Sequence, residues 1–198
     1  DPNANNTGIY ELLYIDNSIL IAGDFSSVQG TSRTGLAQVD LSTGTPTSWA
    51  PTLDGSAIRL SVYNGTVYVA GSFANVNGLP RNRLAAVDLT TGLATPWDPQ
   101  MVGTQFDDLL IMDSTLYAAG TFVEIAGVPR PSLCAFDATN GALLPWEPDF
   151  DQLFGADIRS LEPYGADLLI GGYFSTGAPN VRQDIAVLDR QSGLATAW

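Results

Sequence analysis

The sequence has 198 residues, 45% of them hydrophobic, which is enough to build a sizeable core and argues against disorder. Twenty-one acidic residues stand against eight arginines, and lysine and histidine are both absent. The net charge of −13 therefore disfavours nucleic acid and anionic membrane surfaces as partners. The sequence has no apolar run long enough to predict a membrane span. Because histidine is absent, the chain lacks the commonest zinc ligand and the commonest general base.

The chain contains a tandem repeat. Five positions keep one register through four copies, separated by 48, 49 and 52 residues, which chance does not produce. The recurring residues are Gly23, Gly71, Gly120 and Gly172; Arg33, Arg81, Arg130 and Arg182; Asp40, Asp88, Asp137 and Asp189; Gly44, Gly92, Gly141 and Gly193; and Trp49, Trp97, Trp146 and Trp198. The copies span about 8–55, 56–103, 104–154 and 155–198, and residues 1–7 are expected to complete the end of a preceding repeat.

One copy predicts four short strands in chain order. In the second copy, an alternating apolar segment at 58–62 leads through the turn Asn64-Gly65 into a β-rich segment at 67–73. A third strand at 84–88 ends in Asp88, whose turn leads to a last short strand before Trp97. No segment has the periodicity of a capped helix.

These elements predict an all-β fold: a single β-propeller domain over residues 1–198, built of four tandem four-stranded antiparallel blades. A closed four-blade ring, part of a larger propeller, and self-association of two chains to complete one are all compatible with this pattern. The chain starts at Asp1-Pro2, which matches Asp98-Pro99, and stops at Trp198, so we expect a portion of a longer array.

The second copy resembles the delta-60 type repeats of bacterial β-propellers. The similarity rests on residues 69–73, Asn77-Gly78, Arg81, 84–88 and the segment from Thr91-Gly92 to Trp97-Asp98-Pro99. It implies a propeller fold and an extracellular or cell-surface location, but no reaction. The fourth copy departs from the pattern, because Gly177 and Pro179 replace the residues of the other loops, and we expect that loop to be reshaped.

The repeated residues are interpreted as structural. We expect each Trp to pack between neighbouring blades, and Phe25, Phe73, Phe122 and Phe174 to lie in the core. Each Arg is expected to clamp its loop through a nearby carboxylate or backbone carbonyls, with a ring of anion binders as the alternative. Cys134 aligns with alanines and is expected to be a small buried residue.

Two groups remain as candidate sites. Glu11, Arg59, Asp108 and Ser160 share one position on the first strand of each copy, where a propeller lines its central channel. The acidic linker after Trp146 includes Asp149, Asp151 and Asp157, whose carboxylates could hold calcium, although their spacing matches no known calcium loop.

The sequence contains no motif of a catalytic triad, phosphate loop or cysteine pair, so we expect no enzymatic activity and no cofactor other than calcium. The predicted function is a structural or interaction module of a secreted or surface protein, with a protein or a glycan as its partner. The alternative is a lectin-like propeller that binds carbohydrate or calcium.

Overall fold

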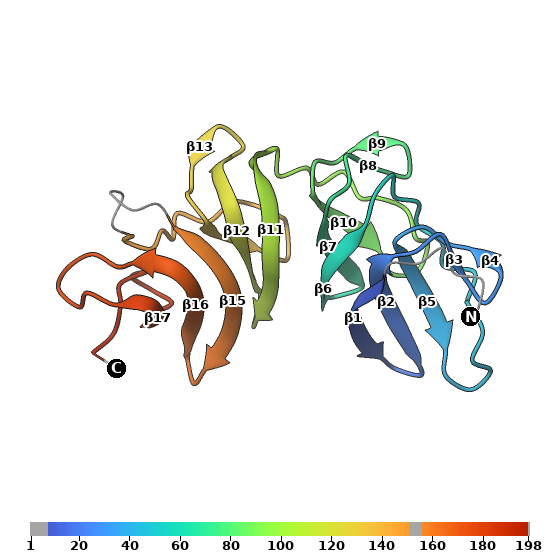
Figure 1. The fold of residues 1–198 in the computed structure, drawn as a ribbon, viewed down its shortest axis with the longest axis horizontal. Coiled ribbons are helices and arrows are strands. Elements are labelled where there is room, and N and C mark those ends of the chain that lie inside the picture. Colours follow the sequence, from blue (N-terminus) through green and yellow to red (C-terminus); the bar gives the residue numbers. More distant parts are fainter. Residues whose placement is uncertain (1–7, 151–155, 198) are drawn as a thin grey trace. The chain divides into compact units, whose positions relative to one another are not determined.

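The computed structural model describes residues 8–150 and 156–197. Figure 1 shows antiparallel sheets joined by turns, and no helix occurs in this part of the chain, as the sequence predicts. The chain divides into two compact units, Asp1–Asp98 and Pro99–Trp198, and each unit holds two of the repeats.

The first unit contains two three-stranded sheets and two short hairpins. The first sheet has the order β1-β2-β5, and the second sheet has the order β6-β7-β10. The hairpins β3-β4 and β8-β9 belong to the loops that carry the repeated Arg. The strands are β1 (Gly8–Ile15), β2 (Ser18–Asp24), β3 (Ser27–Val28), β4 (Thr31–Ser32), β5 (Leu36–Asp40), β6 (Ala57–Tyr63), β7 (Thr66–Gly71), β8 (Asn75–Val76), β9 (Leu79–Pro80) and β10 (Leu84–Asp88).

The second unit repeats this plan with longer strands. In the third sheet, β12 pairs with β11 and β14, and its extended end also pairs with the short β13. The fourth sheet has the order β15-β16-β17. The strands are β11 (Met101–Met112), β12 (Thr115–Ile125), β13 (Val128–Pro129), β14 (Leu133–Asp137), β15 (Asp157–Tyr164), β16 (Asp167–Ser175) and β17 (Gln183–Leu188).

The turns follow from the residues that form them. Asn64 and Gly65 take φ angles of 45° and 75°, the left-handed conformation that a two-residue hairpin requires. The loop of the fourth copy lacks the hairpin of the other three, as its sequence predicts. There the Ala178–Pro179 peptide bond is cis, and the Thr176 hydroxyl accepts the Arg182 backbone N–H at 2.8 Å.

The expectation of four strands per blade is wrong in detail. Each sheet has three main strands, and the predicted fourth strand is reduced to one bridge, such as Val87 with Ala94 in the second sheet. Thr95 still donates its N–H to the Ala86 carbonyl at 2.8 Å, but Pro96 follows and has no N–H to continue the ladder.

Each unit has its own core between its two sheets. In the first unit, Leu20 and Leu36 of the first sheet pack with Val67 and Val69 of the second sheet. In the second unit, Leu133 of the third sheet belongs to the same cluster as residues of the fourth sheet, including Leu168 and Ile170. The repeated phenylalanines are buried, which confirms their expected place; they are Phe25, Phe73, Phe122 and Phe174.

Candidate functional site

Every sheet carries a β-bulge at the same place on its first strand. One residue there has no partner on the neighbouring strand, so the pairing register shifts. The bulged residues are Tyr10, Ile58, Asp107 and Arg159. The repeated glycine lies against this strand, and a Cβ at Gly71 would stand 2.0 Å from the Ser56 carbonyl oxygen. The glycine therefore recurs because two backbones approach closely.

The four predicted channel residues come directly after these bulges. Glu11 and Arg59 belong to the first unit, and Asp108 and Ser160 belong to the second unit. Leu60 donates its backbone N–H to the Glu11 carboxylate, and Leu161 donates its N–H to Asp108 Oδ2 at 2.8 Å. Both carboxylates thus bond a backbone amide of the next sheet in their own unit. Ser160 is exposed at the surface of the fourth sheet.

Arg59 also lines a cavity of about 460 Å³ in the first unit, together with the bulged residues Tyr10 and Ile58. The Arg59 guanidinium donates to the Ile58 carbonyl at 3.0 Å. This cavity is open and lies beside exposed Ile9. Its lining combines apolar side chains with one cation and two serine residues, Ser56 and Ser72.

The repeated arginines fasten the loop to the last segment of their own copy. Arg81 donates to the carbonyl oxygens of Pro80 at 2.6 Å and Thr95 at 2.8 Å. Equivalent pairs of carbonyls receive the guanidinium groups of Arg33 and Arg182. Arg130 donates to the Pro129 carbonyl and to the Glu147 carboxylate at 3.1 Å. The planar fork suits this double contact.

The repeated aspartates close a turn. Asp88 Oδ1 accepts the backbone N–H groups of Thr90 and Thr91, and its carbonyl accepts the N–H of Gly92, whose φ is 73°. Hydrogen bonds from the N–H and then the hydroxyl of Thr91 lower the pKa of Asp88. Turn hydrogen bonds lower the pKa in the same direction at Asp40, Asp137 and Asp189.

Two of the repeated tryptophans, Trp49 and Trp146, join one sheet to the next within their unit. Trp49, which is 3% exposed, donates its indole N–H to the Asp88 carbonyl of the second sheet at 3.0 Å. Trp146 makes the same bond to Asp189 of the fourth sheet at 3.4 Å. Trp97 packs edge to face on Tyr68, with ring centroids 5.3 Å apart. Trp198 lies outside the described residues.

The described part of the acidic linker gives no metal site. Asp157 pairs with Arg159 at 2.6 Å, and the Asp149 carboxylate lies against Gly177. Asp151 lies outside the described residues. Among residues 8–150 and 156–197, no three His, Cys, Asp or Glu side chains gather closely enough to hold a metal ion. Cys134 is buried as expected, and burial raises the pKa of its thiol.

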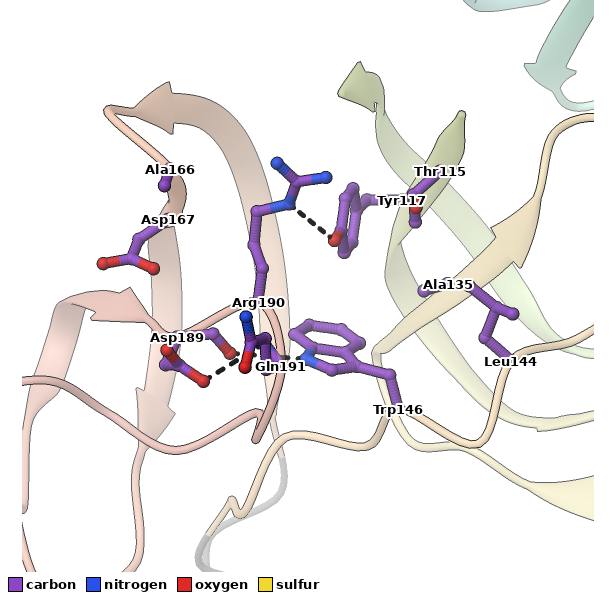
Figure 2. A pocket seen from close by; sticks show the side chains of 10 residues that line it. All are labelled: Thr115, Tyr117, Ala135, Leu144, Trp146, Ala166, Asp167, Asp189, Arg190 and Gln191. Carbon is purple, nitrogen blue, oxygen red and sulfur yellow. Dashed lines mark hydrogen bonds between the residues drawn. The ribbon is translucent and has the colours of Figure 1, made fainter. Parts of the chain in front are cut away.

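A second cavity, of about 400 Å³, lies between the third and fourth sheets of the second unit. Figure 2 shows Asp167 and Arg190 on its fourth-sheet side and the rings of Tyr117 and Trp146 on its third-sheet side. Arg190 donates to the Tyr117 hydroxyl at 3.1 Å, to Asp113 at 3.0 Å and to the Met112 carbonyl at 3.3 Å. We call this cavity the inter-sheet pocket; its lining residues are Thr115, Tyr117, Ala135, Leu144, Trp146, Ala166, Asp167, Asp189, Arg190 and Gln191.

Sequence reasoning missed this pocket, although the repeat carries a signal for it. Arg190 stands at a register position that holds Leu41, Leu89 and Ala138 in the other copies. Asp167 stands where those copies have a hydroxyl residue, Ser18, Thr66 and Thr115. At both of these positions the fourth copy alone has a charged residue, and the structure brings the two side chains to one cavity.

Comparison with known proteins places the repeat in a class. Residues 16–46 and 64–85 match a family described as a domain of unknown function (DUF5122) beta-propeller. These segments lie in the first and second copies. No curated protein sequence matches the chain. These two segments of the chain are therefore similar to a β-propeller family.

Solved structures of similar fold agree with this class. The chain is similar to two computationally designed proteins, Ika8 (TM-score 0.61, 14% identity) and Ika4 (TM-score 0.59, 13% identity). It is also similar to the extracellular domain of a putative one component system from B. thetaiotaomicron (TM-score 0.57, 14% identity). The matches cover 93%, 94% and 90% of this chain, and 46%, 95% and 22% of the three proteins. The chain thus spans about half of Ika8 and about a fifth of the extracellular domain. No helix that could span a membrane occurs in the described residues.

Proposed function

We propose that the chain is a non-catalytic structural or interaction module of a secreted or surface protein, built of delta-60 type repeats that form four propeller blades. The observation that carries this proposal is the use of the repeated residues between sheets. Trp49 and Trp146 make equivalent bonds to the next sheet, and so do the carboxylates of Glu11 and Asp108. Two of the repeated tryptophans, and two of the four residues that follow the bulges, thus join one blade to the next.

The non-catalytic assignment rests on how the carboxylates are used. Asp108 accepts the N–H of Leu109 at one oxygen and the N–H of Leu161 at the other. A carboxylate whose two oxygens are both bonded to backbone amides is a poor candidate for a general base, because both oxygens are already engaged in the fold. A hydrolase or lyase activity of the purified chain that disappears in Glu11→Gln and Asp108→Asn, with the fold intact, would overturn the assignment.

The proposed partner includes a second copy of the chain, which would dock on an open face of the first sheet. Leu12 is 58% exposed, whereas Leu60, at the same register position in the second sheet, is 2% exposed against the first sheet. Tyr14 is also exposed, and its counterpart Val62 packs in the core. In the second sheet, the face that carries Leu60 is covered by the first sheet. The same face of the first sheet, which carries Leu12, is exposed.

The fourth sheet offers the complementary face. Ile185 is 49% exposed, but Leu36, at its register position in the first sheet, is fully buried by the second sheet. Tyr164 is exposed where Ile15 packs against the core. These two faces pack against each other wherever one blade follows another in a unit. The exposed face of the first sheet is therefore proposed to pack against the fourth sheet of a second copy.

Sedimentation equilibrium tests this association. We expect the wild-type chain to self-associate at micromolar concentration, and Leu12→Ser combined with Tyr14→Ser to abolish the association. Leu93→Ser is the matched control, since Leu93 is equally exposed but lies in a turn of the second sheet. A wild-type chain that stays monomeric, or a double variant that associates as before, would refute the proposed partner.

A surface location is consistent with the acidic composition, because a high net charge keeps an exposed protein soluble. The similar extracellular domain has the same fold in that setting. Cell fractionation and protease accessibility of the intact source protein test this part of the proposal. A lectin-like role is the second candidate, favoured by the polar lining of the inter-sheet pocket.

A further inference from the structure

A small residue lines the third-sheet side of the inter-sheet pocket. This residue is Ala135, and the same register position holds Gln38 in the first sheet and Ala86 in the second. In the first sheet the Gln38 amide bonds Ser18 and Thr47 of its own copy, each at 2.9 Å. A glutamine is thus compatible with this strand position of the repeat.

Two polar side chains in the pocket have no partner of their own. Within the described residues, the Asp167 carboxylate and the Gln191 amide make no hydrogen bond or ion pair, and both line the cavity (Figure 2). In the neighbouring Asp189, Oδ1 already accepts the backbone N–H groups of Gln191 and Ser192 in its own turn. A free carboxylate accepts hydrogen bonds, and a free amide both donates and accepts.

The remaining cation is already held. Arg190 donates to a hydroxyl, a carboxylate and a carbonyl, and its guanidinium lies 5.8 Å from the centre of the Tyr117 ring. This network fixes the Arg190 side chain as one wall of the pocket. The positive charge of Arg190 and the negative charge of Asp167 therefore both belong to the lining of the pocket.

The charges select the kind of ligand. An anion that approached Arg190 would meet the carboxylates of Asp167 and Asp189, and a cation that approached Asp167 would meet the Arg190 guanidinium. A neutral ligand with hydroxyl groups avoids both repulsions and supplies the donors that the Asp167 carboxylate lacks. The cavity volume of about 400 Å³ falls within the usual range for small-molecule sites.

We propose that the inter-sheet pocket binds a neutral, hydroxyl-rich small molecule, of which a sugar ring is the representative class. Asp167 accepts hydroxyl groups, Gln191 donates and accepts, and the rings of Trp146 and Tyr117 give the apolar wall. This inference rests on the proposed binding role of the module, and it names the site and the ligand class. It requires no calcium.

The test uses the whole chain and a panel of immobilised neutral, acidic and amino sugars, followed by calorimetric titration of the sugar that binds best. We expect a neutral sugar to bind, equally with and without chelator. Asp167→Thr, which restores the hydroxyl residue of the other copies, is expected to weaken binding about tenfold or more through loss of a charge-assisted hydrogen bond. Ala135→Gln, which puts a longer side chain on the pocket wall, is expected to abolish it.

The matched control is Thr90→Ala in the first unit, at the register position of Gln191, which is expected to leave binding unchanged. Circular dichroism and melting temperature show whether each variant is folded. Absence of any neutral-sugar binding up to about 10 mM, preference for a charged sugar, or binding that survives both Asp167→Thr and Ala135→Gln would overturn the inference. Sedimentation of Ala135→Gln separates the two proposals, because self-association through the first sheet does not depend on this pocket.

Discussion

The close approach at the repeated glycine allows a quantitative test with Gly71→Ala. The added Cβ would stand 2.0 Å from the Ser56 carbonyl oxygen and 3.0 Å from the Ala57 Cα. Both obstacles are backbone atoms, one in the first residue of β6 and one in the residue before it, so no rotamer change can relieve the clash, and the two strands must move apart. That movement also strains the bond from the Ser72 N–H to the Ser56 carbonyl, now 2.9 Å long.

The expected loss of stability follows from these two effects. Overpacking that forces a backbone shift costs about 1–3 kcal/mol, and a weakened backbone hydrogen bond adds about 1 kcal/mol. We therefore expect Gly71→Ala to lower the free energy of unfolding by about 3 kcal/mol. Gly65→Ala is the control, because Gly65 has a φ of 75° and nothing lies within 4 Å of its added Cβ. Its cost is the left-handed strain alone, about 1 kcal/mol.

Urea unfolding followed by far-ultraviolet circular dichroism measures both variants. The gain from restricting the unfolded chain is the same for each glycine-to-alanine change, so it cancels in the comparison. Equal destabilisation by the two variants, or a loss below about 1.5 kcal/mol for Gly71→Ala, would refute the idea that the repeated glycine is kept for close backbone approach.

Two further predictions concern the contacts between and within copies. Trp49→Phe removes the indole hydrogen bond to the Asp88 carbonyl, which still accepts the Gly92 N–H. We expect the free energy of unfolding to fall by about 2 kcal/mol, from the lost hydrogen bond and the smaller ring. The same urea unfolding measures it, and an unchanged midpoint would contradict the docking role. The lowered pKa of Asp88 and its three counterparts makes a pH prediction. A carboxyl whose pKa is lower in the folded state stabilises the fold above its ordinary value of 3.8 and loses that contribution as pH falls below it. The melting temperature is therefore expected to fall steeply below about pH 4, and less steeply in Asp88→Asn; an identical acid dependence in both proteins would count against the turn as the cause.

Much of the fold was predictable because the repeat supplies independent observations of each position. The turn at Asn64-Gly65, the turn closed by Asp88 and the buried Phe73 all follow from local chemistry that recurs in register. The changed loop of the fourth copy was also foreseen, since Gly177 and Pro179 break the pattern. Local sequence and long-range structure agree at these positions.

The bulges and the reduced fourth strand were not predictable in the same way. A bulge adds one residue without a sequence marker of its own, and Tyr10, Ile58 and Asp107 share no side-chain chemistry. Another recurring conformation was hidden for the same reason: every copy has a residue of positive φ at the start of its third main strand, directly before the strand in three copies and inside β17 in the fourth. Only one of the four is glycine; they are Gly35, Arg83, Ser132 and Asp184.

That hidden position shows what tertiary contact adds to the sequence pattern. A Cβ at Gly35 would come within 2.7 Å of the Gly55 carbonyl oxygen in the next sheet. At the same place in the third sheet, Ser132 donates its hydroxyl to the Ala156 carbonyl, which corresponds to that of Gly55. In the first copy, Gly35 leaves room for the neighbouring backbone because it has no side chain. In the third copy, Ser132 makes a hydrogen bond to that backbone. The choice depends on the facing sheet, so no single copy reveals it.

The same comparison explains why the inter-sheet pocket is the place to look for function. A residue that is the same in all four copies serves a contact that every blade makes. Trp49 and Trp146 do this at the boundary between sheets. A residue that departs in one copy answers a local demand. Arg190 and Asp167 depart from the uncharged residues of the other three copies, and both line the inter-sheet pocket. The half-buried Asp167 carboxylate lies beside that cavity, where the proposed ligand would donate hydrogen bonds to it.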